Sequence, residues 1–411
     1  SLPTSSQVCK SCPPEAQCGG LGLENITARA GYWRVDWDES GLGFAACFEE
    51  SACIEGCAQW HRGILCAACT KGAYVGVGGG CSSCGSPSWV AARTIMLVSV
   101  IGAGLSLLLF RAWRNRDKSK SQEVMTLKLL LTHLQTIAVI GSIDLRWPRA
   151  VRGFFDVVET TSTATASGMS FECLMGDSAE DPFARTGVVY SAPLWLFGWA
   201  MVLWGVVGLV KARMKRVRST SQQLLVSSVV LLFLLHTPIT KAALRIMTCR
   251  RISPTYTTSP TSPLSRLVLL MDMEQKCEGE VIGKMLWMGL PVVIVFSIGL
   301  PVLVAFYLRS VGASALYAPG TMRSRLGFLY LGYNANYFYW ESVTALRKVL
   351  LAMITVFLGP SGGGIQALSA LLLVLFALVI HTWAKPYDSA ALNNLELLAL
   401  IAAAVSLVCG V

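Results

Sequence analysis

Charged side chains and histidines are scarce in this sequence. Only 14% of its 411 residues are Asp, Glu, Lys or Arg, and there are four histidines. Soluble domains carry about 25% charged residues, so the low value argues against a large water-soluble domain. The sequence also lacks a glycine-rich phosphate loop, a His-Glu-x-x-His pair and a Gly-x-Ser-x-Gly elbow. We therefore expect no enzyme, with no catalytic residues, no metal and no cofactor.

The net charge of +10 is distributed as in a membrane protein. The two densest basic runs, Arg111–Lys128 and Lys211–Arg218, each follow directly after a hydrophobic segment. Lys and Arg accumulate in this way in short cytoplasmic loops between membrane helices. We therefore expect membrane lipids, and no nucleic acid, among the partners of this chain.

Cysteine is concentrated at one end of the chain. Ten of the fourteen cysteines precede residue 85, and six of these form three Cys-x-x-Cys pairs. Such pairs bind zinc in cytosolic proteins. The even count and the glycosylation sequon at Asn25 favour disulfides formed in the secretory pathway, with zinc as the alternative. The ten candidates are Cys9, Cys12, Cys18, Cys47, Cys53, Cys57, Cys66, Cys69, Cys81 and Cys84.

Residues 1–88 are predicted to form a small Cys-rich extracellular domain. A domain of this size buries little apolar surface, and each disulfide adds roughly 2–4 kcal/mol to its stability. Its aromatic residues Tyr32, Trp33, Trp37 and Trp60 allow a partner-binding surface. The alternative is a spacer or cap without a ligand.

Residues 89–411 contain eight apolar segments near the length of about 20 residues that a membrane-spanning helix needs. The predicted fold class is mainly α, a polytopic transmembrane helix bundle with an extracellular or lumenal N-terminus. We expect this multi-pass protein in the plasma membrane or another membrane derived from the secretory pathway. The segments are 89–110, 125–145, 188–210, 223–247, 285–308, 338–359, 364–384 and 392–411.

Alternation of these segments places two long loops, 146–187 and 248–284, on the outside. Cys173, Cys249 and Cys277 lie in these loops, so we expect Cys173 to pair with Cys249 or Cys277. Cys409, in the last segment, is expected to be an inert core residue.

The sixth segment carries charged residues at membrane depth. After Lys348 about eleven apolar residues remain before Pro360, and they cover roughly 17 Å, about half of the hydrocarbon core. Glu341, Arg347 and Lys348 must then lie in the inner half of the bilayer, where a charge is a functional-site hypothesis by default. The alternative is that Arg347 and Lys348 extend to the interface while Glu341 pairs with a neighbour.

The eighth segment opens with further polar side chains. Asn393, Asn394 and Glu396, together with Glu341, would form an oxygen-rich site for calcium or another cation if they converge.

Two other segments have features that bear on motion or binding. Lys241 and Arg245 are outer-half charges on one face of the fourth segment, suited to anion or lipid contacts or to anchoring at the interface. The fifth segment contains Gly-Leu-Pro twice, at 289–291 and 299–301, which predicts a bent helix.

Several short stretches taken together resemble a known family. The stretches are GILCAACTKGAY at 63–74, LKLLLTHLQ at 127–135, IDLRWP at 143–148, LGFLYLGY at 326–333, YWE at 339–341, LRK at 346–348, KPYD at 385–388 and NLE at 394–396. With them the chain is similar to polytopic surface proteins of single-celled eukaryotes that join Cys-rich ephrin-receptor-like or EGF-like repeats to a transient-receptor-potential-like membrane domain.

This resemblance implies a surface protein that conducts cations in response to a sensory or mechanical input. One departure concerns the pore. Channels of this kind hold a pore helix and filter between their last two pore-lining helices, whereas residues 359–364, which join the sixth and seventh segments, leave no room for them. The alternative is a pore loop in 248–284, although the Pro/Ser/Thr-rich start of that loop is not typical of a filter.

Three functions follow as hypotheses. The first is a cation channel or sensory channel subunit, with Glu341, Arg347, Lys348 and Glu396 near the gate or ion path. The second is a cell-surface receptor or anchoring subunit that binds an extracellular or membrane protein partner, or a second copy of itself, through its Cys-rich domain. The third is a transporter for lipid or a small solute, although the sequence shows no internal repeat.

Overall fold

A computed structural model describes most of the chain as two compact units. One comprises residues 1–84 together with 249–278, and we call it the disulfide-rich unit. The other comprises residues 85–248 together with 279–411, and we call it the helical unit. The residues described are 12–19, 26–35, 43–47, 50–54, 56–75, 80–115, 122–143, 145, 147–148, 151, 153–155, 158, 173, 181–213, 220–252, 256–257, 266–318 and 320–410.

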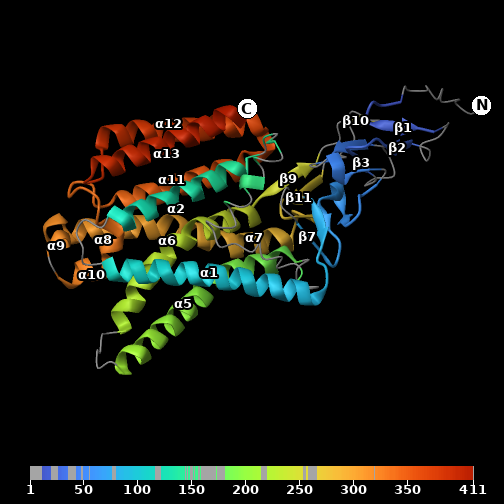
Figure 1. Cartoon of the computed structure of the whole chain (residues 1–411). Coiled ribbons are helices and arrows are strands. Elements are labelled where there is room, and N and C mark those ends of the chain that lie inside the picture. Colours follow the sequence, from blue (N-terminus) through green and yellow to red (C-terminus); the bar gives the residue numbers. More distant parts are fainter. Residues whose placement is uncertain are drawn as a thin grey trace, which may run out of the picture. The chain divides into compact units, whose positions relative to one another are not determined.

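The disulfide-rich unit is built from short antiparallel strands, as expected of a domain with too little sequence to bury a large core (Figure 1). Its N-terminal elements are β1 Ala16–Cys18, β2 Ile26–Ala28, β3 Tyr32–Val35, β4 Gly43–Ala46, η2 Glu50–Ala52, β5 His61–Arg62, η3 Ile64–Cys66, β6 Ala68–Cys69, β7 Ala73–Val75 and β8 Cys81–Ser83. The outer loop supplies β9 Cys249–Ile252, β10 Tyr256–Thr257, β11 Arg266–Leu269 and β12 Asp272–Lys276.

The segment 249–278 folds together with the N-terminal residues. Strand β10 pairs with β4, with Tyr256 opposite Phe44. Ile252 and Val268 enter one apolar cluster with Val35, Ala45 and Leu65. This part of the predicted outer loop therefore has to be counted with the Cys-rich domain rather than with the helices.

The disulfides confirm an oxidised N-terminal region, but no described Cys-x-x-Cys pair closes on itself. Cys84 and Cys173 are disulfide-bonded as well, which leaves no cysteine thiolate for zinc among the described residues of this unit. Cys9 and Asn25 lie outside the described residues. The bonds are Cys12–Cys18, Cys47–Cys53, Cys57–Cys66, Cys69–Cys81 and Cys249–Cys277.

Two predictions about single cysteines are wrong. Cys173 pairs with neither Cys249 nor Cys277, because these two are bonded to each other across the ends of their own strands. Cys409 is a free thiol, but it is exposed on the surface of the bundle rather than buried in its core.

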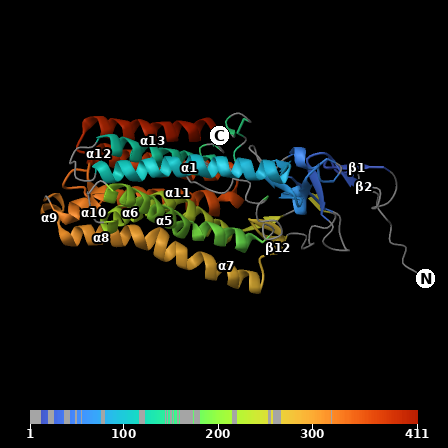
Figure 2. The ribbon, with the colours of Figure 1, turned by 60° about the horizontal axis from the view of Figure 1, so that its bottom comes forward.

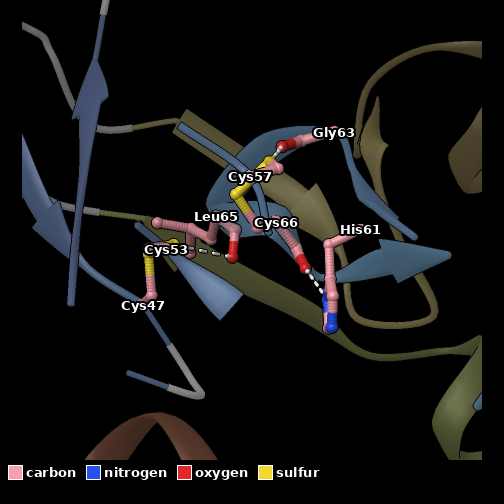
Figure 3. The surroundings of a disulfide bond; sticks show 7 residues. All are labelled: Cys47, Cys53, Cys57, His61, Gly63, Leu65 and Cys66. Carbon is pink, nitrogen blue, oxygen red and sulfur yellow. Dashed lines mark hydrogen bonds between the residues drawn. A yellow bond between two sulfur atoms is a disulfide. The ribbon is translucent and has the colours of Figure 1, made fainter. Parts of the chain in front are cut away.

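His61 lies beside the Cys57–Cys66 disulfide and contacts the backbone of Cys66 (Figure 3). Its Nε2 accepts a hydrogen bond of 3.1 Å from the backbone N–H of Cys81, so its Nδ1 carries the proton and donates to the carbonyl of Cys66 at 3.0 Å. The backbones of Leu65 and Cys66 are both left-handed, with φ of 57° and 52°. Such conformations are costly for residues other than glycine, and the crosslinks and the imidazole hold them in place.

Among its described residues, the helical unit contains seven helices long and apolar enough to span a membrane, which confirms the predicted transmembrane bundle. Figure 2 shows two of them, α12 and α13, side by side. The elements are α1 Pro87–Asn115, α2 Gln122–Gly141, α5 Pro182–Arg213, α6 Thr220–Ile246, α7 Glu280–Pro291, η6 Val292–Gly299, α8 Leu300–Val311, α9 Ala313–Tyr317, α10 Thr321–Tyr330, α11 Trp340–Phe357, η7 Gly359–Ser361, α12 Gly363–Ala384 and α13 Ala390–Gly410.

The sixth predicted segment becomes α11, which differs from the other seven. It has 18 residues and three charges, Glu341, Arg347 and Lys348, and it packs against α2, α6, α8 and α12. The link from α11 to α12 is the single 3-10 turn η7, as its length required.

Large apolar side chains cover the outside of the bundle. Trp287 on α7 and Trp383 on α12 are each 82% exposed, and Trp195 on α5 is 75% exposed. Soluble proteins rarely expose apolar patches of this extent, whereas lipid accepts them. Polar side chains lie instead on the inward faces of α2, α6 and α11. The bundle is thus apolar toward its surroundings, and its interior holds buried polar side chains beside an apolar core.

Helices α6 and α7 approach closely because Gly289 has no side chain. A Cβ at this position would lie 2.1 Å from Cγ of Met247 and 3.0 Å from the carbonyl oxygen of Ala243, both on or next to α6. A Cβ at Gly283, on the same helix, would meet open space.

We expect Gly289→Ala to lower the stability of the bundle by about 1–3 kcal/mol, since it overpacks this contact. Gly283→Ala is the matched control and should leave the stability unchanged or slightly higher. Thermal unfolding of both variants in the same detergent measures the difference. Equal midpoints for the two variants would contradict the close packing of α6 on α7.

Candidate functional site: a buried charge cluster

A buried ion pair joins α2 to α11. The Lys128 ammonium contacts Oε2 of Glu341, and both side chains are almost fully buried. Nζ of Lys128 also donates to the carbonyl of Phe328 at 2.9 Å, and the Tyr333 hydroxyl donates to Oε2 of Glu341 at 2.9 Å. Charges in an apolar environment are tolerated only with such partners, so each half of the pair requires the other.

Three aromatic rings surround the Lys128 ammonium. Its Nζ lies 5.6 Å from the ring centroid of Phe233, 5.0 Å from that of Phe328 and 5.2 Å from that of Tyr333. Each ring presents its negative face to a cation within about 6 Å. These rings come from α6, α10 and the segment after α10, so the cation fixes four parts of the chain at once.

A second lysine continues the polar interior along the same helices. Nζ of Lys348 donates to Oε1 of Gln135 at 3.0 Å and lies 4.8 Å from the ring centroid of Phe233. The Thr237 hydroxyl donates to the same Gln135 oxygen at 3.0 Å. We call this line from Lys128 and Glu341 through Lys348 and Gln135 to Thr237 the polar seam.

The spacing of residues explains why the seam is continuous. Lys128 and Gln135 are seven residues apart on α2, and Glu341 and Lys348 are seven apart on α11. Seven residues are close to two helical turns, so each pair lies on one face of its helix. When α2 and α11 face each other, Lys128 therefore meets Glu341, and two turns further along Gln135 meets Lys348.

A second ion pair joins α11 to α13. Nη1 of Arg347 donates to Oε1 of Glu396 at 2.9 Å, and Glu396 is buried. With Lys128 and Lys348, the cluster has three basic groups and two carboxylates. Lys348 is 2% exposed and does not extend to the interface.

The predicted oxygen-rich cation site is not assembled in this arrangement. Glu341 and Glu396 each form an ion pair with a basic side chain, and the side chain of Asn393 forms hydrogen bonds with the backbone of Tyr387. Asn394 is exposed. No group of three or more potential metal ligands occurs among the described residues. A role for Glu341, Arg347, Lys348 and Glu396 in an ion path stays a prediction.

The two outer-half charges, Lys241 and Arg245, differ in exposure. Lys241 is buried in the bundle, whereas Arg245, one turn further along α6, is exposed.

The sequence analysis missed Lys128, because this residue is the last of a basic run that is typical of a cytoplasmic loop. The signal that would have identified it is its spacing to Gln135, which repeats that of Glu341 to Lys348.

Comparison with known proteins gives one similarity. The chain is 23% identical to "Cysteine repeat modular protein A" of Toxoplasma gondii over 496 aligned positions, which cover 95% of this chain and 15% of that protein. No protein-family profile matches the chain, and no solved structure matches it. The similarity agrees with the Cys-rich repeats, whereas the transient-receptor-potential-like resemblance finds no counterpart.

We expect Lys128→Met and Glu341→Gln each to lower the stability by about 3–5 kcal/mol, because each leaves one charge or acceptor buried alone. The double variant should cost about 2 kcal/mol less than the sum of the two. The exposed pair Glu280 and Lys284, 2.8 Å apart on α7, is the control and should show no measurable coupling. Chemical unfolding in detergent measures all six variants, and additive costs for Lys128 and Glu341 would contradict the pairing.

Proposed function

We propose that the chain is the membrane-anchored part of a surface receptor or anchoring protein, whose disulfide-rich unit holds an extracellular or membrane partner. One observation supports this proposal. Two segments that are separated by the first four membrane helices, residues 12–83 and 249–278, fold into one disulfide-containing unit. A loop that only connects two helices does not need to share an apolar core with the N-terminal residues. A unit that binds a partner benefits from such a core, because a preorganised binding surface loses less conformational freedom on binding.

Further contacts support a fixed geometry for this unit. Nη1 of Arg62 lies 3.7 Å from Oε1 of Glu274, which adds a link between the N-terminal residues and the outer loop. Gly63, with a positive φ of 77°, lies beneath the Glu274 carboxylate, where a Cβ would be 2.6 Å from Oε1. The name of the Toxoplasma gondii relative also describes a modular Cys-rich protein. The chain spans only 15% of that protein. Any activity of the whole relative is therefore only a proposal for this chain.

Trp60 is the contact residue that we propose for the partner. It is 39% exposed, while Tyr32 and Trp33 are partly covered and Trp37 lies outside the described residues. Its backbone has a φ of 70°, and its carbonyl accepts a hydrogen bond of 2.8 Å from the backbone N–H of Thr70, which fixes the turn. Rigid, exposed tryptophans are frequent anchors of protein interfaces.

A photo-crosslinking residue at Trp60 should capture one discrete partner from intact cells. The same residue at the exposed Lys71 is the control and should capture much less of it. Equal display of both variants at the surface is checked with a non-permeant label. Equal capture at both positions, or capture at neither, would count against the proposed surface.

A cation channel is the second candidate, and the buried polar seam favours it. Intramembrane charges often mark ion pathways, and the seam joins polar groups of three neighbouring helices. Glu341 of the seam and the neighbouring Glu396 each have a basic partner, which argues for a sealed interior rather than an open path.

Current across planar bilayers holding the purified chain tests this second candidate. A channel built on the seam predicts a cation-selective current that falls at least tenfold in Glu341→Gln. Glu274→Gln, in the disulfide-rich unit, should leave that current unchanged, and circular dichroism verifies that both variants are folded. Silent bilayers with folded, oriented wild-type protein would remove the channel.

A further inference from the structure

The fifth membrane span contains a π-helical segment, Val292–Gly299, between α7 and α8. One Gly-Leu-Pro sequence ends just before it at Pro291, the last residue of α7, and the second begins at its last residue, Gly299, and places Pro301 in the first turn of α8. The two motifs thus delimit a change of helix type, where the sequence had predicted only a bend. π-helical turns are rare and occur frequently at functional sites.

Proline chemistry explains why the α-helix is interrupted here. Pro301 has no backbone N–H, so it cannot donate to the carbonyl of Ser297 four residues earlier. That carbonyl receives its hydrogen bond from Nε2 of His236 on α6, at 3.0 Å. Gly299 is required as well, because a Cβ there would lie 2.8 Å from the carbonyl oxygen of Ile294.

Helix α6 makes a second contact with the same residue. The hydroxyl oxygens of Thr240 and Ser297 are 2.8 Å apart, and Thr240 lies one turn after His236. Both contacts tie Ser297 of the π-helix to α6. We call His236, Thr240 and Ser297 the α6 lock.

The lock leaves one polar atom unsatisfied. Nε2 of His236 faces a carbonyl and carries the proton, so Nδ1 is a buried acceptor, and no described residue donates to it. A buried acceptor without a donor raises the free energy of this state. A π-helical turn holds about one residue more than an α-helical turn, so a change of this segment to α-helix would turn α8 by about 100° relative to α7.

The ends of the two locked helices are joined through the disulfide-rich unit. Thr248, just after α6, precedes Cys249, and Glu278 follows Cys277 just before α7. The Cys249–Cys277 bond closes this loop with a Cα–Cα distance of 6.2 Å. Spacing between the outer ends of α6 and α7 therefore depends on a bond that belongs to the other unit. We call this bond the clamp.

We propose that Val292–Gly299 is a two-state switch, held in its π-helical state by the α6 lock and set from outside through the clamp. This switch is a regulatory element of the proposed receptor. It rests on the proposed function only for the identity of the partner whose binding sets the switch. Its test needs no partner, so failure of the switch and failure of the partner surface are distinguishable.

Amide hydrogen exchange of the full chain in lipid nanodiscs tests the switch. In Cys249→Ser/Cys277→Ser, peptides covering 292–299 should exchange at least tenfold faster than in the wild type. Cys12→Ser/Cys18→Ser is the matched control, since it removes a disulfide of the same unit that no membrane helix adjoins, and it should leave these peptides unchanged.

A second variant keeps the test decisive if the first does not fold. Three glycines inserted between Thr248 and Cys249 leave every disulfide in place and only slacken the link to α6, so the same acceleration is expected. Unchanged exchange at 292–299 in the clamp variants, or an equal acceleration in the Cys12/Cys18 control, would overturn the proposal.

Discussion

The Lys128–Glu341 ion pair sets the packing of the helical unit. Neither charge is tolerated alone inside an apolar bundle, so α2 and α11 can meet in only one register. The aromatic rings of Phe233, Phe328 and Tyr333 then have to approach the ammonium, which positions α6 and α10 as well. A shift of α11 by one residue would turn both Glu341 and Lys348 away from their partners. The pair thus favours one register of α2 against α11 over the others.

The disulfide-rich unit follows the opposite principle. It has little apolar surface, and covalent bonds replace a large core. The participation of residues 249–278 gives this small unit three chain connections to the helices, at residues 84–85, 248–249 and 278–279. The ends of α1, α6 and α7 are therefore each attached covalently to this unit. This connectivity is what joins a proposed binding surface to a proposed switch.

Hydropathy and cysteine spacing were sufficient to predict the helical bundle and the oxidised N-terminal region, since both depend on local composition. The buried charges of α11 were also predictable, because too few apolar residues follow Lys348 to reach across a bilayer. Disulfide pairing was not predictable, because neighbouring cysteines such as Cys66 and Cys69 point to different partners. The pairing of β10 with β4 joins residues more than 200 positions apart, and no local pattern records it.

The partner of Glu341 was missed for a different reason. Lys128 belongs by position to a basic run, and only the fold shows that it turns inward. The π-helix was partly visible in the paired Gly-Leu-Pro motifs, but its stabilisation by His236 and Thr240 depends on a neighbouring helix. Residues whose role depends on a partner far away in the sequence are therefore the ones that sequence analysis does not identify.

Water access to the polar seam tests most directly the claim that its charges are paired within a sealed bundle. Thr237, 2% exposed, can be replaced by cysteine in a chain that carries Cys409→Ala, and treated with a membrane-impermeant thiol reagent from each side in turn. The exposed Arg114, near the end of α1, replaced by cysteine in the same way, gives the rate for an accessible site. The account predicts no modification at position 237 from either side while position 114 reacts. Modification at position 237 at a comparable rate would show a water-filled path and contradict it.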